Sequence, residues 1–225
     1  MPALPRPADS ATTVARVAAS VRAGILSGAL APGTPLREEA AAAEYGVSRH
    51  TIRAAFQRLV VERLAVAEAY RGVRVASFDR AQVVALQQLR AALEVEAVRI
   101  AGERFGEEWP EEAVAPARAA LDRLEQLASE AGDADADATV DWLEVERIHA
   151  DFHRALVEAS ASPRIIETHA ALGSELLLFL LHVRPHYTLE SLIAEHRTLL
   201  DELPTRGGDA VREHLEHSTQ LLLGG

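Results

Sequence analysis

The sequence predicts a mainly α-helical protein in two parts: a small helical unit that ends in a β-hairpin, and a larger antiparallel all-helical bundle. Helical patterns near the start are followed by a short alternating stretch, whereas from Ala81 onward only helical periods recur. Residues before 79 carry ten basic and six acidic side chains, a net +4, and the rest carry 13 and 28, a net −15. We interpret the chain as a flexible arm (1–10), a first domain (11–77) and a helical second domain (80–222).

The composition is that of a globular protein. Of the 225 residues, 48% are hydrophobic and 25% charged, which excludes wholesale disorder and fibrous architectures. Cysteine is absent, which excludes disulfides, thiol catalysis and cysteine-ligated zinc. The longest apolar run, Leu176–Leu181, is far shorter than the roughly 20 residues of a membrane span, and the first residues do not look like a secretion signal. We expect a cytoplasmic protein with no membrane partner.

The first domain contains two helical patterns joined by a tight turn. Glu38–Tyr45 stops at Gly46, and a second pattern begins after Ser48. This arrangement is typical of a helix-turn-helix, whose second helix enters the major groove of DNA. Behind it, Ala65–Val75 alternates weakly around a glycine-containing turn and predicts a β-hairpin, which in this place forms a wing.

The second helix of this motif leaves polar side chains at its exposed first turns. Arginine there can donate to guanine O6 and N7, and the tip of a wing can approach the sugar-phosphate backbone or the minor groove. The alternative is a structural three-helix unit with solvated arginines. The candidate DNA-binding residues are Ser48, Arg49, His50, Thr51, Arg53, Arg71 and Gly72.

The second domain shows six helical patterns with short breaks, which predicts an antiparallel bundle. Gly132–Ala138 is interpreted as an acidic linker, because it lacks the glycine and the terminal glutamate of a calcium-binding EF-hand loop. The patterns cover about 86–100, 114–128, 139–160, 163–183, 188–203 and 209–222.

Histidines carry the chemistry of this bundle. His149 and His153 are four residues apart, so both rings project from one face of a helix, as metal ligation from a helix requires. His196 lies on the fifth pattern among leucines that seek the core. Alternatively, these histidines only cap or bridge helices within an acidic bundle.

The last helix offers two further histidines, His214 and His217. About seven residues separate His196 from the helix end near Leu203, and about eight separate the next helix start from His217, against five for His214. His217 therefore lies at about the same distance from the connecting loop as His196, and it is predicted as the fourth metal ligand. His214 is predicted to line the same cavity, and a different loop would reverse the two.

The first domain resembles a known family. Val21–Leu36, Tyr45–Leu59 and Arg71–Val73 look like the winged helix-turn-helix of GntR-type bacterial transcription regulators, over roughly residues 11–77. The resemblance implies that the arginines at 49 and 53 and the wing glycine at 72 contact operator DNA. One departure concerns the helix before the turn, where the usual Glu-Arg-Glu-Leu reads Glu38-Glu-Ala-Ala. Glu39 thus stands where the family often has a DNA-contacting arginine.

The second domain resembles the FCD ligand-binding domain of the FadR subgroup, over about residues 80–222. The resemblance rests on Leu89–Glu94, Phe152–Ser160 and Glu195–Asp201. Metal-binding members hold a divalent ion with one aspartate and three histidines, the aspartate four residues before the first histidine. Here His149 takes that position, so the site would be made of imidazoles, which favour zinc or nickel.

Arg90 and Glu94 match the first-helix motif of this domain. Arg90 could reach the carboxylate of an acidic effector, and both residues, with His214, are candidates for effector binding. The competing interpretation is a plain surface ion pair, because the two residues are four apart on a helix.

Together these features predict a ligand-responsive transcription regulator, a repressor and not an enzyme. A homodimer on a palindromic operator is expected, because one short helix and one wing bury too little surface for tight binding. The effector would be a small organic acid. Two alternatives are a metal-dependent hydrolase using a histidine-bound water, for which no general base is evident, and a metal-free bundle that binds an apolar acyl ligand.

Overall fold

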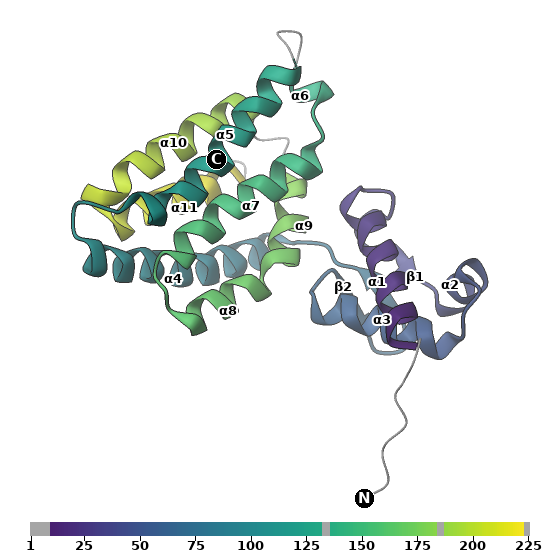
Figure 1. The fold of residues 1–225 in the computed structure, drawn as a ribbon. Coiled ribbons are helices and arrows are strands. Elements are labelled where there is room, and N and C mark those ends of the chain that lie inside the picture. The colour runs from purple at the N-terminus through teal and green to yellow at the C-terminus, as the bar shows by residue number, and fades with distance from the viewer. Residues whose placement is uncertain (1–9, 132–135, 184–186, 223–225) are drawn as a thin grey trace, which may run out of the picture. The chain divides into compact units, whose positions relative to one another are not determined.

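The computed structural model describes residues 10–131, 136–183 and 187–222. Contacts between residues divide the chain into two units, Met1–Ser77 and Phe78–Gly225, whose folds are drawn in Figure 1. The predicted arm at 1–10 lies outside the described residues, apart from Ser10. The mainly helical fold class, with a wing behind the helix-turn-helix, is confirmed.

The first unit is a three-helix fold closed by a small sheet. It contains α1 (Ser10–Leu26), α2 (Glu38–Tyr45) and α3 (Arg49–Val61), and α1 packs on α3. Apolar side chains at helical spacing form its core, because α1 and α3 each bury one stripe. The buried side chains of these stripes include Val17, Val21, Ile25, Ile52, Phe56 and Leu59. Leu64, just before β2, and Val75, of the third strand, are buried as well.

The turn between α2 and α3 directs the second helix. Gly46 ends α2 with a left-handed backbone (φ 63°), a conformation that side chains with a Cβ rarely adopt. Ser48 then caps α3: its Oγ accepts a hydrogen bond from the Thr51 N–H at 3.1 Å. Because Ile52 and Phe56 face the core, the first turn of α3 presents its polar side chains to solvent.

The wing is a hairpin of β2 (Ala65–Glu68) and β3 (Gly72–Val75), paired from Ala65 with Val75 to Glu68 with Gly72. A third strand, β1 (Pro35–Leu36), pairs antiparallel with β3, so the sheet order is β1-β3-β2. A proline is tolerated at the edge of a sheet, and the Leu36 side chain is buried there.

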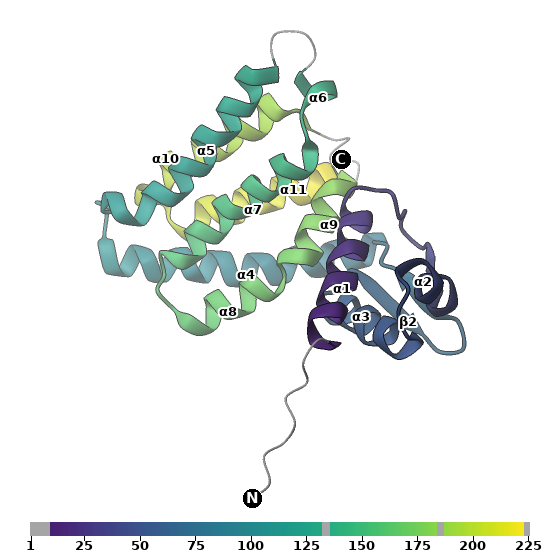
Figure 2. The same cartoon turned by 45° about the vertical axis from the view of Figure 1, so that its right-hand side comes forward.

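The second unit is all-helical (Figure 2). Helix α5 packs on α7 and α10, and α11 packs on α4 and α10. The core lies between these helices and is built mainly from leucine, valine and alanine. The helices are α4 (Arg80–Phe105), α5 (Glu111–Ala131), α6 (Ala136–Thr139), α7 (Trp142–Glu158), α8 (Pro163–Ala171), α9 (Gly173–Val183), α10 (Leu189–Arg206) and α11 (Gly208–Leu222).

Several boundaries differ from the prediction. Helices α4 and α5 are longer than their patterns. The pattern at 163–183 is two helices, α8 and α9, with a break at Leu172. Part of the acidic linker forms α6. Helix α10 continues past Pro204 to Arg206, although this proline has no N–H to donate to the carbonyl four residues back.

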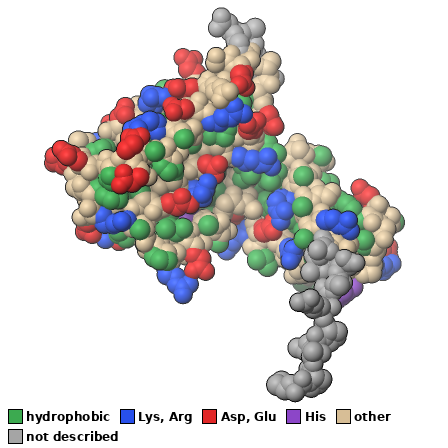
Figure 3. All heavy atoms as spheres, in the orientation of Figure 1, with side chains coloured by type: hydrophobic (Ala, Val, Ile, Leu, Met, Phe, Trp, Pro, Cys, Tyr) green, Lys and Arg blue, Asp and Glu red, His purple; other side chains and the backbone are tan. Residues whose placement is uncertain are grey.

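The surface of the second unit is polar. Charged side chains of both signs are interspersed over the face drawn in Figure 3. Many belong to pairs three or four residues apart on one helix, such as Arg99 with Glu96 and Glu103. Among the described helices, none combines the length and the apolar composition that a bilayer crossing requires.

Candidate DNA-reading surface and histidine centre

The predicted DNA-reading residues lie at the start of α3. Arg49 and Arg53 expose 62% and 61% of their side chains, and His50 is also exposed. Ser48 and Thr51 are engaged with each other through the helix cap, with their hydroxyl oxygens 2.9 Å apart. The arginines are therefore the long cationic side chains that this helix end offers to a ligand.

Both arginines form ion pairs with acidic residues of α2. Arg53 donates from Nε to Glu38 Oε1 at 2.8 Å and from a terminal nitrogen to Oε2 at 2.6 Å, a bidentate pair. The hydrogen bonds from Arg53 hold the pKa of Glu38 below its ordinary value. Arg49 likewise pairs with Glu39, through one terminal nitrogen. The sequence placed Glu39 near this surface but did not predict either pairing.

The wing carries the other two candidates at its tip. Arg71 exposes 75% of its side chain and lies 3.7 Å from a Glu68 oxygen. Gly72 follows it with a left-handed backbone (φ 82°), where any larger residue would be strained. The structure therefore puts a cation next to a bare stretch of backbone, as close approach to a nucleic-acid strand requires.

Three buried histidines meet inside the second unit. The Nε2 atom of His153 lies 3.2 Å from that of His149 and 3.0 Å from that of His196. The first two side chains come from α7 and the third from α10, and all are at least 95% buried. Their ligand nitrogens lie within 4.8 Å of one another, close enough to bind one metal ion. The structure thus brings together three of the four predicted ligands.

Each of these rings is anchored through its other nitrogen. His149 Nδ1 lies 3.1 Å from a Glu146 oxygen, and His153 Nδ1 lies 2.8 Å from a Glu94 oxygen. His196 Nδ1 lies 2.7 Å from the Leu192 carbonyl oxygen. A carboxylate or a carbonyl only accepts, so each Nδ1 carries the proton. The three Nε2 atoms therefore direct lone pairs towards one point, as metal ligands held by outer partners do.

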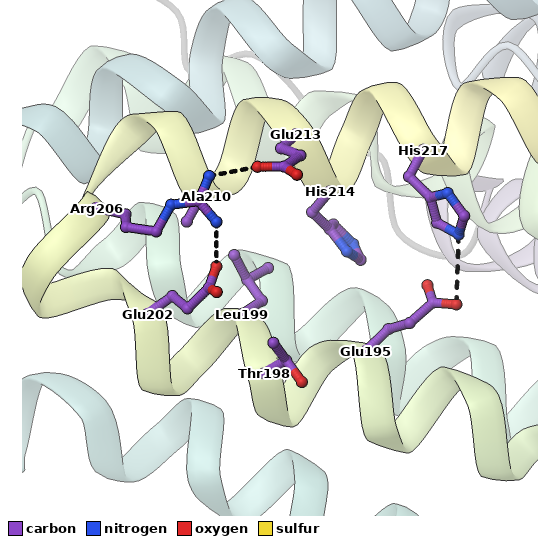
Figure 4. Close-up of a pocket in the computed structure, with 9 residues that line it drawn as sticks. All are labelled: Glu195, Thr198, Leu199, Glu202, Arg206, Ala210, Glu213, His214 and His217. Carbon is purple, nitrogen blue, oxygen red and sulfur yellow. Dashed lines mark hydrogen bonds and ion pairs between the residues drawn. The ribbon is translucent and has the colours of Figure 1, made fainter.

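The last helix contributes His214 to this centre, and not His217. The His214 ring lies 4.5 Å from the His196 ring and 5.4 Å from the His153 ring, between centroids. Figure 4 shows His214 pointing into the space between α10 and α11, whereas His217 points to Glu195, at 3.7 Å. The prediction compared only the rise along the two helices. Rotation of about 100° per residue around α11 turns His217 away from the buried line of Val211 and Leu215.

Arg90 and Glu94 form the predicted ion pair, but inside the protein. Arg90 Nε donates to Glu94 at 2.6 Å, and the two side chains are 2% and 0% exposed. The interpretation as a surface pair is therefore wrong. Burial by itself would raise the pKa of Glu94, but Arg90 and His153 beside it hold that pKa well below its ordinary value. The carboxylate stays charged and accepts from Arg90, His153 and His169.

Four residues around this centre escaped the sequence reasoning. Glu146 could have been found, because it lies three residues before His149 on the same helix face. His169 of α8, which contacts Glu94 at 3.1 Å, and Tyr187, which donates to Glu146, gave no sequence signal. Gln87 lies one turn before Arg90; it is buried, and neither polar atom of its amide has a hydrogen-bond partner among the described residues.

Two cavities reach the histidine centre from different sides. One, of about 240 Å³ between α10 and α11, is bordered by His214 and by the acidic side chains of Glu195, Glu202 and Glu213. The other, of about 170 Å³, is lined by Arg90, Ala150, Asp151, His153, Arg154, His169, Ala170, Gly173 and Leu176. Of these two, the second brings Arg90 and a histidine of the centre to one space.

Comparison with known proteins agrees with both units. Residues 13–75 match the profile of the bacterial regulatory proteins of the gntR family, and residues 85–220 match the FCD domain. The chain belongs to the GntR family. It is thus a DNA-binding transcription regulator with a ligand-binding FCD domain, as the sequence resemblance predicted.

Known transcription regulators that are similar to this chain support the assignment. A probable D-xylose utilization operon transcriptional repressor of Paenarthrobacter nicotinovorans is 26% identical over 88% of this chain and 82% of the relative. The HTH-type transcriptional repressor GlaR of Escherichia coli K12 is 29% identical over 64% and 61%. A putative GntR regulator from Rhodococcus sp. RHA1 has a similar structure, with a TM-score of 0.73 and 26% identity over 95% of this chain and 99% of that one.

The buried imidazoles make the stability of the metal-free GntR regulator depend on pH. Burial and the charge of Arg90 lower the pKa of His153 to about 4. Burial and the neighbouring rings hold the pKa of His149 and His196 well below 6.5. As pH falls below about 6.5, the unfolded chain binds protons that the folded state does not. We expect the free energy of unfolding to fall by up to about 1.4 kcal/mol per pH unit for each such histidine.

Urea denaturation after chelator treatment, at pH 7.5, 6 and 5, measures this slope. The His153→Leu variant is the matched control and should show a shallower dependence. Equal stability at pH 7.5 and 5 would show that these rings are not held neutral.

The arginines at the start of α3 are predicted to read operator DNA in this GntR regulator. Arg49→Ala and Arg53→Ala should each weaken binding by about 1 to 3 kcal/mol, because each removes a base-edge donor. Fluorescence anisotropy at fixed salt, with a duplex that the wild-type protein selects from a randomised library, measures the change. Arg16→Ala, on the exposed side of α1, removes the same charge away from α3 and serves as the control. Three variants of equal affinity would refute the assignment.

Proposed function

We propose that this regulator is a repressor that holds a zinc or nickel ion in its second unit and leaves its operator when a small organic acid binds beside that ion. The observation that carries the proposal is the set of Nε2 atoms of His149, His153 and His196, each held inward by an acceptor on Nδ1. Three neutral acceptors that face one another inside a protein lack donors, and a cation bound between them would satisfy all three.

The dimensions of the centre fit such an ion. Nitrogens bound tetrahedrally to zinc at about 2.0 to 2.1 Å lie roughly 3.3 Å apart. The two distances from His153 Nε2, 3.2 and 3.0 Å, come near this value, and all three ligand atoms lie within 4.8 Å of one another. His214 is the neighbouring side chain suited to a fourth position. Imidazole ligands without a carboxylate favour zinc or nickel over calcium or magnesium. When bound, the ion would accept a carboxylate oxygen either in place of His214 or as a fifth ligand.

Charge indicates which cavity takes the effector. The space between α10 and α11 is bordered by three glutamates, and its one arginine, Arg206, is paired with Glu202 and Glu213. It would repel an organic acid. The cavity beside His153 is lined by Arg90, Arg154 and one aspartate. Arg90 is paired with Glu94, and Arg154 is paired with Asp151 and Glu158, so this space is less acidic than the first. Its volume of about 170 Å³ suits a small acid, since drug-sized ligands occupy about 300 to 1,000 Å³.

A packed path leads from this cavity to the start of α4. His169 and Leu176 line the cavity, and Leu172 and Leu176 pack on Val83 and Leu86 of α4. The Phe78 ring meets Phe179 edge-to-face at 5.8 Å, just before α4 begins. Residues 76–79 connect this end to the wing strand. An effector that binds two arrangements of α8 and α9 unequally would therefore shift the DNA-binding unit.

The small DNA-reading surface of one chain indicates how the protein binds its operator. One short helix and one wing tip make few base contacts, so we infer a homodimer on a palindromic operator in the cytoplasm. Repression is supported by the two relatives described as repressors.

The alternatives fit the centre less well. A hydrolase needs a general base beside the metal-bound water. The two nearest carboxylates instead hold the predicted metal ligands in place. Glu94 accepts hydrogen bonds from His153 and Arg90. Glu146 accepts one from Tyr187 and lies beside His149. An apolar acyl ligand would meet Arg90 and two histidines in the cavity beside His153. We therefore propose a regulator without enzymatic activity.

Metal analysis of purified variants tests the centre. His153→Ala should abolish zinc or nickel uptake, because the His153 Nε2 atom is the one that contacts both of the others. His214→Ala should weaken uptake, and His217→Ala should leave it unchanged, since the His217 ring pairs with Glu195 at the surface. The last variant is the matched control.

Equilibrium dialysis followed by elemental analysis gives the stoichiometry. The far-ultraviolet spectrum of each variant checks that it folds. Full metal occupancy in His153→Ala, or loss of metal in His217→Ala with retention in His214→Ala, would overturn the centre as described.

A further inference from the structure

We propose that Glu39, supported by Glu38, is a specificity-determining residue for operator binding: it removes the general attraction of the reading helix for phosphates but leaves its base-reading donors in place. Two carboxylates at the start of α2 face the two arginines at the start of α3. The inference goes beyond the metal and the effector and depends on neither.

The pairing is directional. Arg53 gives Glu38 the edge formed by Nε and one terminal nitrogen, in a bidentate contact. A guanidinium has five N–H donors in a plane, so the remaining terminal nitrogen is still able to donate. Arg49 contacts Glu39 through one terminal nitrogen, which leaves further donors on that group. Both arginines can therefore be oriented by a carboxylate and still reach a guanine edge.

The pairing also changes the charge that DNA meets. Each arginine with its glutamate is a neutral pair, so this helix end adds no net positive charge at Arg49 and Arg53. Binding to arbitrary DNA depends mainly on the number of phosphates neutralised, whereas operator binding also depends on hydrogen bonds to bases. Neutral pairs thus weaken non-specific binding more than specific binding.

Fold stability does not explain the arrangement. The Arg49–Glu39 pair is exposed, with 62% and 73% of the side chains accessible, and such pairs contribute little to folding. A hollow in the surface, lined by Arg37, Glu38, Glu39, Ala40 and Arg49, opens at the same place. The carboxylates therefore lie on the side of α2 that an approaching duplex would meet together with Arg49.

Glu39→Gln tests the proposal, with Glu44→Gln as the matched control. Glu44 lies on the same short helix, is exposed, and forms no ion pair with any residue that the structure describes. The full-length protein would be titrated with two duplexes of equal length: one selected by the wild type from a randomised library, and one of scrambled sequence. Thermal melting of both variants checks the fold.

We expect Glu39→Gln to raise affinity for the scrambled duplex about threefold to tenfold, as an arginine freed from its partner gains a phosphate contact. Affinity for the selected duplex should rise less, so the ratio of the two falls. The slope of log affinity against log salt should steepen by about one. Glu44→Gln should change the affinity ratio and the salt slope less than Glu39→Gln does.

The same substitution in an Arg49→Ala background separates pairing from general charge. If Glu39→Gln lowers the ratio when Arg49 is present and leaves it unchanged in the Arg49→Ala background, the proposal stands. A ratio that is unchanged in Glu39→Gln alone, or that falls equally in both backgrounds, would overturn it. Failure of the wild type to select any duplex would instead contradict the DNA-binding assignment itself.

Discussion

The hydrogen bonds to the outward nitrogens of three histidines determine how the second unit works. Because Glu146, Glu94 and the Leu192 carbonyl accept at Nδ1, each ring is fixed in one tautomer and one orientation. All three Nε2 atoms then converge on one point. Without these acceptors the rings could rotate or protonate, and the proposed metal centre would lose its geometry.

Glu94 connects side chains of three helices. It lies on α4 and contacts Arg90 of the same helix, His153 of α7 and His169 of α8. A buried carboxylate is tolerated only where several donors surround it. The same residue therefore anchors a ligand of the centre and connects it to the cavity wall and to the helix that follows the DNA-binding unit. One polar network therefore joins the histidine centre, the cavity and α4.

Local patterns predicted much of this protein. The turn at Gly46 and the helical pattern after Ser48 identified the DNA-reading helix, because each signal acts over a few residues. The spacing of His149 and His153 likewise put both rings on one face. These features depend on helix periodicity and local turn chemistry alone and were confirmed in the fold.

Features that join distant segments were missed or misplaced. The choice between His214 and His217 depends on how α11 is rotated against α10, which rise along a helix does not reveal. The contact of His169 with Glu94 spans 75 residues, and no spacing rule reaches that far. Burial of Arg90 with Glu94 depends on helices packed from elsewhere in the chain.

Anomalous diffraction at the zinc absorption edge, from crystals grown with zinc, tests the central claim most directly. We expect one peak inside the second unit, about 2.0 to 2.1 Å from the Nε2 atoms of His149, His153 and His196. A peak bound through their Nδ1 atoms, or zinc found only at surface residues, would contradict it.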